Sequence, residues 1–197
     1  RRSVLSATTR LEARSDAVTA SAEGRWALLF STQLAPEVGR PADALPLVQP
    51  LIDATYATFF KLAPALAGAQ QDGGQAGGGS NEQRLNLETG VVENRVRVPL
   101  PASLPFVGDS ASALEIRVDG LVAPDDGADK LSVQFTECGF RLLPRGGGGD
   151  AARGVTVPLP RPVGSLRTTF CDESLRVSRG GRGGVFVLKR LRERGVE

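Results

Sequence analysis

The acidic pair Asp172-Glu173 is the stretch whose residue types and spacing come nearest to chemical machinery. Two adjacent carboxylates offer a general acid and a general base, but adjacent residues of an extended strand point to opposite faces, which is the wrong geometry for shared proton transfer. Pairing with Arg176 or Arg179, which would pin this acidic corner, is the better interpretation. Because the chain also has no histidine and only one tyrosine, we predict that it is not an enzyme.

Cys138 and Cys171 are the other side chains with reactive potential. Two cysteines without any histidine are too few to complete a zinc site, so no metal is expected. We predict that both are buried thiols on strands. A redox-switched disulfide between them stays open as the alternative, since the sequence does not fix their separation.

Charge is nearly balanced overall but uneven along the chain. The 24 basic and 22 acidic residues give a formal charge of +2, which is too small to predict nucleic acid as a partner. From Leu175 to Glu197, seven Lys/Arg against two Glu leave a local excess of five positive charges (7 − 2). This basic C-terminal segment is a candidate contact for anionic lipid headgroups or an acidic protein face. A solvated edge strand carrying protective charges is the plainer interpretation.

The elements that position these residues are predicted to be short β-strands. Near the C-terminus, Leu175/Val177 and Val185–Leu188 flank the connector Ser178–Gly184. Because glycine tolerates positive φ, this connector can return the chain as a hairpin. Its arginines form one short Arg-Gly-Gly repeat without interleaved aromatics, which favours a turn over a nucleic-acid segment. Alternation of apolar and polar residues predicts the remaining strands. They cover residues 25–30, 84–87, 91–100, 114–118, 130–143, 155–159 and 168–171.

This series amounts to about eight to nine antiparallel strands in one domain, residues 1–197. Strands with one apolar face close into a barrel or pack as a sandwich, and the pattern alone leaves both open. A helical lead-in is expected over residues 1–23, with its helix at 3–14. A second helix is expected to start near Pro50, as a cap on the sheet or a lid over a cavity.

Residues 68–80, which are rich in glycine, are predicted to form a flexible loop without chemistry. No apolar run reaches the roughly 18–20 residues that cross a bilayer, so we expect a soluble or peripheral protein. The absence of methionine at position 1 fits removal of a transit peptide.

Two segments resemble a known family. Gly24–Thr32 (GRWALLFST) is similar to an opening strand with the pattern Gly-x-Trp-x-Leu-Leu-(Tyr/Phe)-(Ser/Thr), and Asp172–Gly180 with Gly183–Leu188 is similar to a C-terminal signature. Both resemble the plastid lipid-associated proteins, also called the fibrillin or plastoglobulin family. The chain departs from the family in a shorter helical lead-in, in the insertion at 68–80, and in Cys171, where the family commonly has Leu.

The resemblance implies a lipocalin-like antiparallel β-barrel with one or two flanking α-helices. In the lipocalin entry motif the Trp closes the barrel floor, and an Arg from a late strand lies across it. Here that implies Trp26 with Arg176 or Arg179, through cation–π stacking. The residues carried over from the family motifs have structural roles, and they are Gly24, Trp26, Asp172, Arg176, Arg179 and Gly180.

The resemblance also implies a plastid location, in the stroma or on plastoglobules or thylakoids. In the first hypothesis the barrel interior binds a hydrophobic isoprenoid, quinone, carotenoid or acyl lipid, or the protein coats a lipid-body or membrane surface. In the second, the barrel is filled by its own side chains and the basic C-terminal segment docks onto a plastid protein complex. An enzyme of lipid metabolism is a third hypothesis with no motif behind it. The side chains expected to line the interior are Trp26, Leu28, Phe30, Val96, Val98, Ile116, Val118, Val133, Phe135 and Phe186.

Overall fold

The structure, a computed structural model, describes most of the predicted strands and the first helix. The described residues are 2–14, 16–32, 80–100, 111–125, 129–144, 154–159, 161, 163–181 and 183–192. The helix expected near Pro50 and residues 68–79 of the expected loop lie outside this set.

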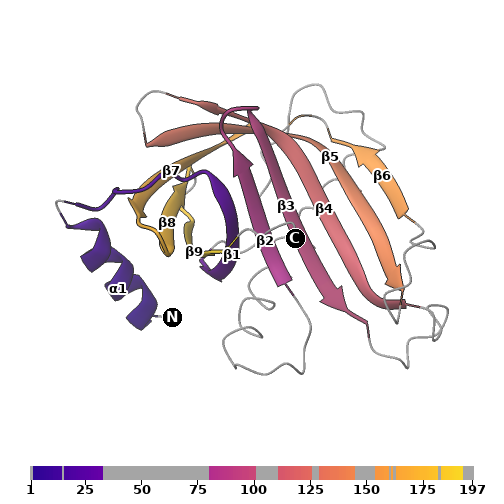
Figure 1. Cartoon of the computed structure of the whole chain (residues 1–197), viewed down its shortest axis with the longest axis horizontal. Helices are drawn as coiled ribbons and strands as arrows, with labels where there is room; N and C mark the ends of the chain where they lie inside the picture. Colours follow the sequence, from indigo (N-terminus) through magenta and orange to yellow (C-terminus); the bar gives the residue numbers. More distant parts are fainter. Residues whose placement is uncertain are drawn as a thin grey trace.

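One helix and nine strands form the described part of the chain (Figure 1). The helix α1 spans Arg2–Glu12, close to the predicted range 3–14. The strands are β1 (Gly24–Ser31), β2 (Ser80–Asn86), β3 (Val91–Pro99), β4 (Ala111–Pro124), β5 (Lys130–Pro144), β6 (Gly154–Pro158), β7 (Val163–Cys171), β8 (Leu175–Gly180) and β9 (Val185–Arg190). No helix in the described residues is long and apolar enough to cross a bilayer.

The sheet closes on itself. Its strand order is β4-β3-β2-β1-β9-β8-β7-β5-β6, and β4 also pairs with β5. All of these pairings are antiparallel, so eight of the described strands form a ring and β6 extends it at one edge of β5. The prediction of a mainly β, antiparallel fold of eight to nine strands with a flanking helix is confirmed, and the sheet is ring-like. Closure of one continuous sheet through the β4–β5 and β5–β7 pairings removes the sandwich alternative.

Strand alternation separates an apolar inner face from a charged outer face. In β3, Val92 and Val96 are fully buried, whereas Glu93 and Arg95 between them are half-buried on the opposite face. Residues directly opposite across a pair share a face, so Ile116 of β4 continues the inner face beside Val96. This alternation is the sequence signal that predicted the strand.

β5 sets the shape of the ring. One edge of β5 pairs with β4 along most of its length, while the other edge pairs with β7 at residues 130–134 and with β6 at residues 137–141. The ring is therefore closed through the first third of β5 only. Figure 1 shows the consequence, because β2 to β5 run together as long strands with β6 beside them, while β7, β8, β9 and β1 curl tightly next to α1.

The register shifts in four places among the described strand pairs. The shifts lie between Leu28 and Phe30, between Ala111 and Ala113, between Asp119 and Gly120, and between Thr168 and Phe170. A bulge bends a strand and increases its twist, which a small closed sheet requires. Gly120 illustrates the tight fit, since a Cβ there would lie 2.5 Å from the carbonyl oxygen of Gln134.

Helix α1 packs on the outer face of the tightly curled strands. Leu5 and Leu11 of the helix pack against a cluster of Phe170, Val177 and Val185. This contact explains why those strands are apolar on both faces: the ring buries one face, and the helix covers the other. The lead-in is thus part of the folded domain.

Two turns between strands form where glycine allows a positive φ. Gly90 has a φ of 66° between β2 and β3, and Gly183 has a φ of 80° between β8 and β9. The second turn is shorter than the predicted connector, because β8 continues through Gly180 and buries Ser178 completely. β2 also begins earlier than predicted, at Ser80.

Candidate functional site

Trp26 closes one end of the ring, where β1 begins and β9 ends. Its side chain is fully buried, and its indole Nε1 donates a hydrogen bond of 2.9 Å to the carbonyl oxygen of Ala22. The guanidinium of Arg176 lies 4.8 Å from the ring centroid, and that of Arg190 lies 4.2 Å from it. The predicted stacking of Arg176 on Trp26 is therefore confirmed, and Arg190 is a second partner that the sequence reasoning missed.

The two arginines differ in environment. Arg190 is half-buried and donates to the carbonyl oxygens of Glu23 at 2.9 Å and Ser21 at 2.8 Å. Arg176 is fully buried, and it appears in none of the ion pairs formed by the described residues. Burial lowers the pKa of Arg176 to about 9, and the nearby charge of Arg190 also lowers it. At neutral pH, Arg176 remains a cation without a carboxylate partner.

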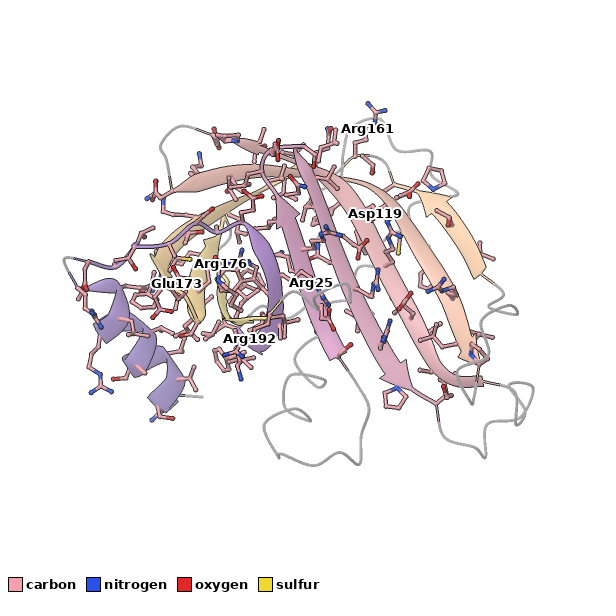
Figure 2. The ribbon with its side chains drawn as sticks, viewed as in Figure 1. Arg25, Asp119, Arg161, Glu173, Arg176 and Arg192 are labelled. Carbon is pink, nitrogen blue, oxygen red and sulfur yellow. The ribbon has the colours of Figure 1, made fainter. Side chains whose placement is uncertain are left out.

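Arg176 links β8 to β2 across the interior of the ring, and Figure 2 labels it beside the tightly curled strands. Its Nη1 donates to the carbonyl oxygen of Ala22 at 3.0 Å, and its Nη2 donates to Oε1 of Gln83. Gln83 in turn donates to Asn94 of β3 at 3.0 Å. A polar chain thus crosses the otherwise apolar interior near Trp26.

Four buried polar atoms near Trp26 and this chain lack a hydrogen-bond partner among the described residues: Nε of Arg176, Nε of Arg190, Oγ of Ser178 and Oγ1 of Thr168. Ser178 and Thr168 are directly opposite on β8 and β7, and Arg176 lies two residues before Ser178 on the same face. Leaving such groups unpaired away from water is unfavourable. The sequence analysis did not predict this cluster, because it assigned Ser178 to the glycine-rich turn and not to strand β8.

The apolar lining of the interior forms three clusters. The cluster near Trp26 includes Leu28 and Phe186, and a second includes Val133 with Phe135 at its border. Phe135 also packs against the third cluster, so this side chain connects the second cluster to the one at the far end of the ring. The predicted interior residues in that third cluster are Val96, Val98, Ile116 and Val118.

Phe30 does not share a face with Leu28, contrary to the prediction from simple alternation. The bulge in β1 makes Leu28 the partner of Leu188 and Phe30 the partner of Val187. Val187 pairs with Val177, which packs under α1. The register therefore turns Phe30 toward the outer, helix-covered face.

The acidic corner is held by backbone contacts and not by the arginines that were predicted to pair with it. Asp172 Oδ1 accepts hydrogen bonds from the backbone N–H groups of Ser174 and Leu175, each at 2.7 Å, and from the Ser174 hydroxyl at 3.0 Å. Burial acts to raise the pKa of Asp172, but these hydrogen bonds outweigh it and lower the pKa. Asp172 thus fixes the turn between β7 and β8.

Arg179 has a different role from the one implied by the family resemblance. It lies away from Trp26 and forms a two-pronged ion pair with Glu12 of α1, with distances of 2.8 and 2.6 Å. The hydrogen bond from Arg179 lowers the pKa of Glu12 despite the opposing effect of burial. Thr169 also donates to Glu12. These contacts fasten α1 to the ring.

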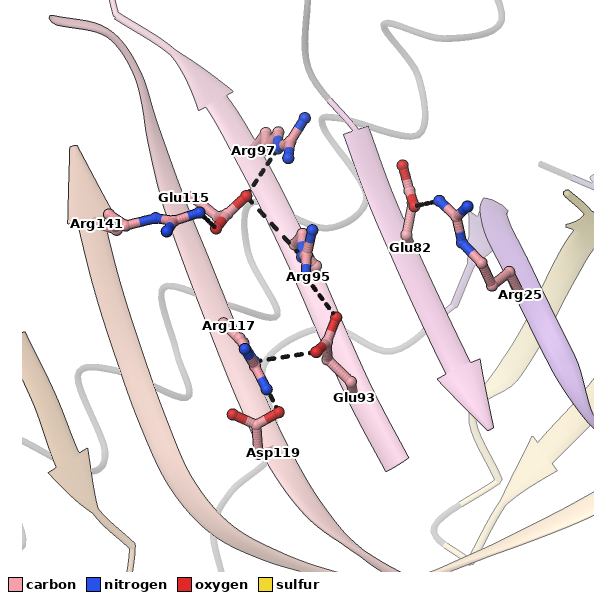
Figure 3. Close-up of polar contacts among 9 residues, drawn as sticks. All are labelled: Arg25, Glu82, Glu93, Arg95, Arg97, Glu115, Arg117, Asp119 and Arg141. Carbon is pink, nitrogen blue, oxygen red and sulfur yellow. Dashed lines mark hydrogen bonds and ion pairs between the residues drawn. The ribbon is translucent and has the colours of Figure 1, made fainter. Parts of the chain in front are cut away.

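The outer face of β1 to β5 carries a lattice of ion pairs (Figure 3). Its centre is Glu115, which is 3% exposed and lies 2.8 Å from Arg97 and 3.0 Å from Arg141. Burial acts to raise the pKa of Glu115. The hydrogen bond from Arg97 and the charges of the surrounding arginines act in the opposite direction and outweigh burial, so the pKa of Glu115 is lowered. Arg95 and Arg97 thus point outward from the ring.

A polar pocket of about 240 Å³ lies on the same part of the sheet, and its lining residues are Arg25, Glu82, Gln83, Arg84, Glu93 and Arg95. Its lining mixes both signs of charge without an apolar floor. Small-molecule sites are mostly apolar with a few oriented polar groups, so this pocket is a weaker candidate for a hydrophobic ligand than the ring interior.

The two cysteines are free and buried, as predicted. Burial raises the pKa of Cys138 to about 11 and also raises the pKa of Cys171. They belong to different apolar clusters at separate places in the ring, and no disulfide joins them. Within the described residues, no group of His, Cys, Asp or Glu side chains is arranged to hold a metal ion.

Comparison with known proteins gives one match. The sequence model of the PAP_fibrillin family matches residues 51–189, which include the C-terminal signature and strands β2 to β8 with most of β9. The segment Gly24–Thr32 precedes the matched range. Searches of curated proteins and of solved structures returned no match.

Proposed function

The chain belongs to the PAP_fibrillin family of plastid lipid-associated proteins, and we propose that its ring binds a hydrophobic isoprenoid or acyl lipid among the inward-facing side chains. The proposed site comprises Trp26, Leu28, Val96, Val98, Ile116, Val118, Val133, Phe135 and Phe186. The family implies a plastid location, and within the plastid we propose that the protein acts at plastoglobules or thylakoid membranes.

One observation carries this proposal. At the end of the ring opposite Trp26, the inward apolar side chains of Val98, Leu114 and Phe140 are only half-buried, although they belong to the same cluster as the fully buried Val96. Apolar side chains that face a shared centre and remain accessible offer a favourable surface to a hydrophobic ligand. The closed end near Trp26 and the accessible end near Val98 define the direction in which a ligand would enter.

The test is direct detection of a bound lipid. The purified protein is extracted with organic solvent, and the extract is analysed by mass spectrometry. Added α-tocopherol and a short-chain plastoquinone are then titrated against the protein. We expect Val98→Phe, which fills the accessible end, to weaken binding. Val91→Phe, on an exposed outer position, serves as the matched control. Repeated absence of both co-purified and added lipid would refute the proposal.

The alternative is a ring filled by its own side chains that docks onto a plastid complex through the basic C-terminal segment. This alternative has less support than lipid binding, because few basic side chains of that segment are available for docking. Of its seven basic residues, Arg176 is buried, Arg179 is paired with Glu12, and Arg190 lies on Trp26. Lys189 and Arg192 are the basic side chains of the described part of this segment that stay exposed. Two exposed charges form a small electrostatic surface for docking.

A further inference from the structure

We propose that Arg176, Ser178 and Thr168 form a polar subsite inside the ring that binds the carboxylate of a long-chain amphipath, with the tail directed toward Val98. This inference rests on the proposed function, because it names the headgroup chemistry of the ligand that the same interior would hold. It adds a specific recognition element to a site that is otherwise apolar.

The first argument is the unmatched charge. Arg176 is fully buried, and its Nη groups bond only to neutral oxygens, those of Ala22 and Gln83. A buried cation without a counter-ion is costly, and a bound anion removes that cost. Arg190 is the other cation beside Trp26, but it is only half-buried and donates to the carbonyl oxygens of Glu23 and Ser21. The fully buried charge is therefore that of Arg176 alone, and a monoanion such as a carboxylate balances it.

The second argument is the set of unused donors. Nε of Arg176 and the hydroxyls of Ser178 and Thr168 are buried without partners, and all three residues lie on the inner face of β7 and β8. Side chains directly opposite in an antiparallel pair have Cβ atoms about 5 Å apart, so the two hydroxyls are neighbours. One N–H and two O–H donors suit an acceptor with several lone pairs, and a carboxylate provides about four such positions.

The third argument is the apolar path that continues from this cluster. Leu166, two residues from Thr168 on the same face, pairs with Leu131 of β5. Leu131 belongs to the cluster that contains Val133 and borders Phe135, and Phe135 also packs against the cluster at the accessible end. A linear tail that starts at the polar subsite would follow these side chains to the half-buried end of the ring.

The experiment compares ligands that differ only in charge. Oleate and methyl oleate are titrated against the full chain by displacement of a fluorescent probe. We expect oleate to bind at least about tenfold more tightly than its methyl ester, as one charge-assisted contact allows. Ser178→Ala and Thr168→Val should each reduce this preference, and Arg176→Met should abolish it.

Because Arg176→Met also removes contacts to Ala22, Gln83 and Trp26, Ser178→Ala is the decisive variant. Its hydroxyl has no partner, so a purely structural role predicts unchanged or greater thermal stability and an unchanged oleate preference. The subsite predicts unchanged or greater stability together with a weaker oleate preference. Ser112→Ala, whose hydroxyl already bonds to the carbonyl oxygen of Pro144 at 3.2 Å, is the control.

The outcomes separate the two proposals. Equal binding of oleate and methyl oleate, or an unchanged preference in Ser178→Ala, means that the three donors hold only water and overturns the subsite while lipid binding stands. Binding of neither oleate, methyl oleate nor α-tocopherol overturns both the subsite and the proposed function.

Discussion

Replacement of Arg190 by alanine is expected to destabilise the fold by removing one of the two guanidinium groups that lie on Trp26. Two hydrogen bonds to backbone carbonyl oxygens are lost, at 2.8 and 2.9 Å, together with a cation–π contact at 4.2 Å. Each hydrogen bond contributes about 1 kcal/mol net, and an accessible cation–π contact contributes about 0.5–1 kcal/mol. The carbonyl groups are exposed and regain water, so the expected loss is about 2 kcal/mol.

The assay uses the fact that Trp26 is the sole tryptophan of the chain. Urea unfolding is followed by its intrinsic fluorescence, and we expect Arg190→Ala to lower the unfolding midpoint at an unchanged slope. The native emission maximum should move to longer wavelength, because the arginine that covers the indole is gone. Arg190→Lys keeps the charge but loses the forked donor geometry, so it should fall between alanine and the native chain.

Lys189→Ala is the matched control, because Lys189 is the preceding residue of the same strand and is exposed. It should change the free energy of unfolding by less than about 0.5 kcal/mol. If Arg190→Ala behaves like Lys189→Ala, the arginine does not brace Trp26, and the description of this end of the ring is wrong.

Three other predictions follow from the packing of the ring. Glu12→Gln should destabilise the fold by about 1 kcal/mol at pH 7. Because the folded pKa of Glu12 is lowered, its contribution is present above the unfolded pKa of about 4.3 and is lost as pH falls, so the two chains should converge in urea unfolding below that range. Gly120→Ala should cost about 1–3 kcal/mol, because the added Cβ meets a backbone carbonyl of β5, whereas Gly164→Ala, with open space around it, should be neutral by thermal unfolding. Cys138 and Cys171 should resist a disulfide reagent at pH 8 until denaturant is added, and rapid labelling of the native protein would contradict their burial.

Alternation was a sufficient signal for the strands that are apolar on one face. β3 and β4 have their inward valines and outward arginines where the sequence places them, because pairing in a closed sheet leaves no other face for the apolar side chains. β2 was harder to predict over its first residues, since its inward positions include Asn81 and Gln83. Polar inward residues hide a strand from any method that reads hydrophobicity alone.

Bulges and long-range polar partners were the features that the sequence could not supply. The bulge in β1 depends on how β1 meets β9, more than 150 residues later, and it alone decides the direction of Phe30. Arg179 finds Glu12 at a sequence separation of 167 residues. Arg176 and Arg179 were equivalent candidates for Trp26 in the sequence, and only the tertiary register selects Arg176 and adds Arg190.

The asymmetry of the ring links the fold to its proposed function. β5 has 15 residues, but β7 pairs with only its first five, residues 130–134, and β6 occupies a later part of the same edge. A β7 that matched β5 in length would enclose both ends and bury Val98, Leu114 and Phe140 as completely as Val96. Because it stops early, one end is sealed by Trp26 between two arginines, and the other keeps apolar side chains within reach. A ligand with a polar head and a long tail fits such a ring in one orientation only, with its head at the unpaired donors of Arg176, Ser178 and Thr168.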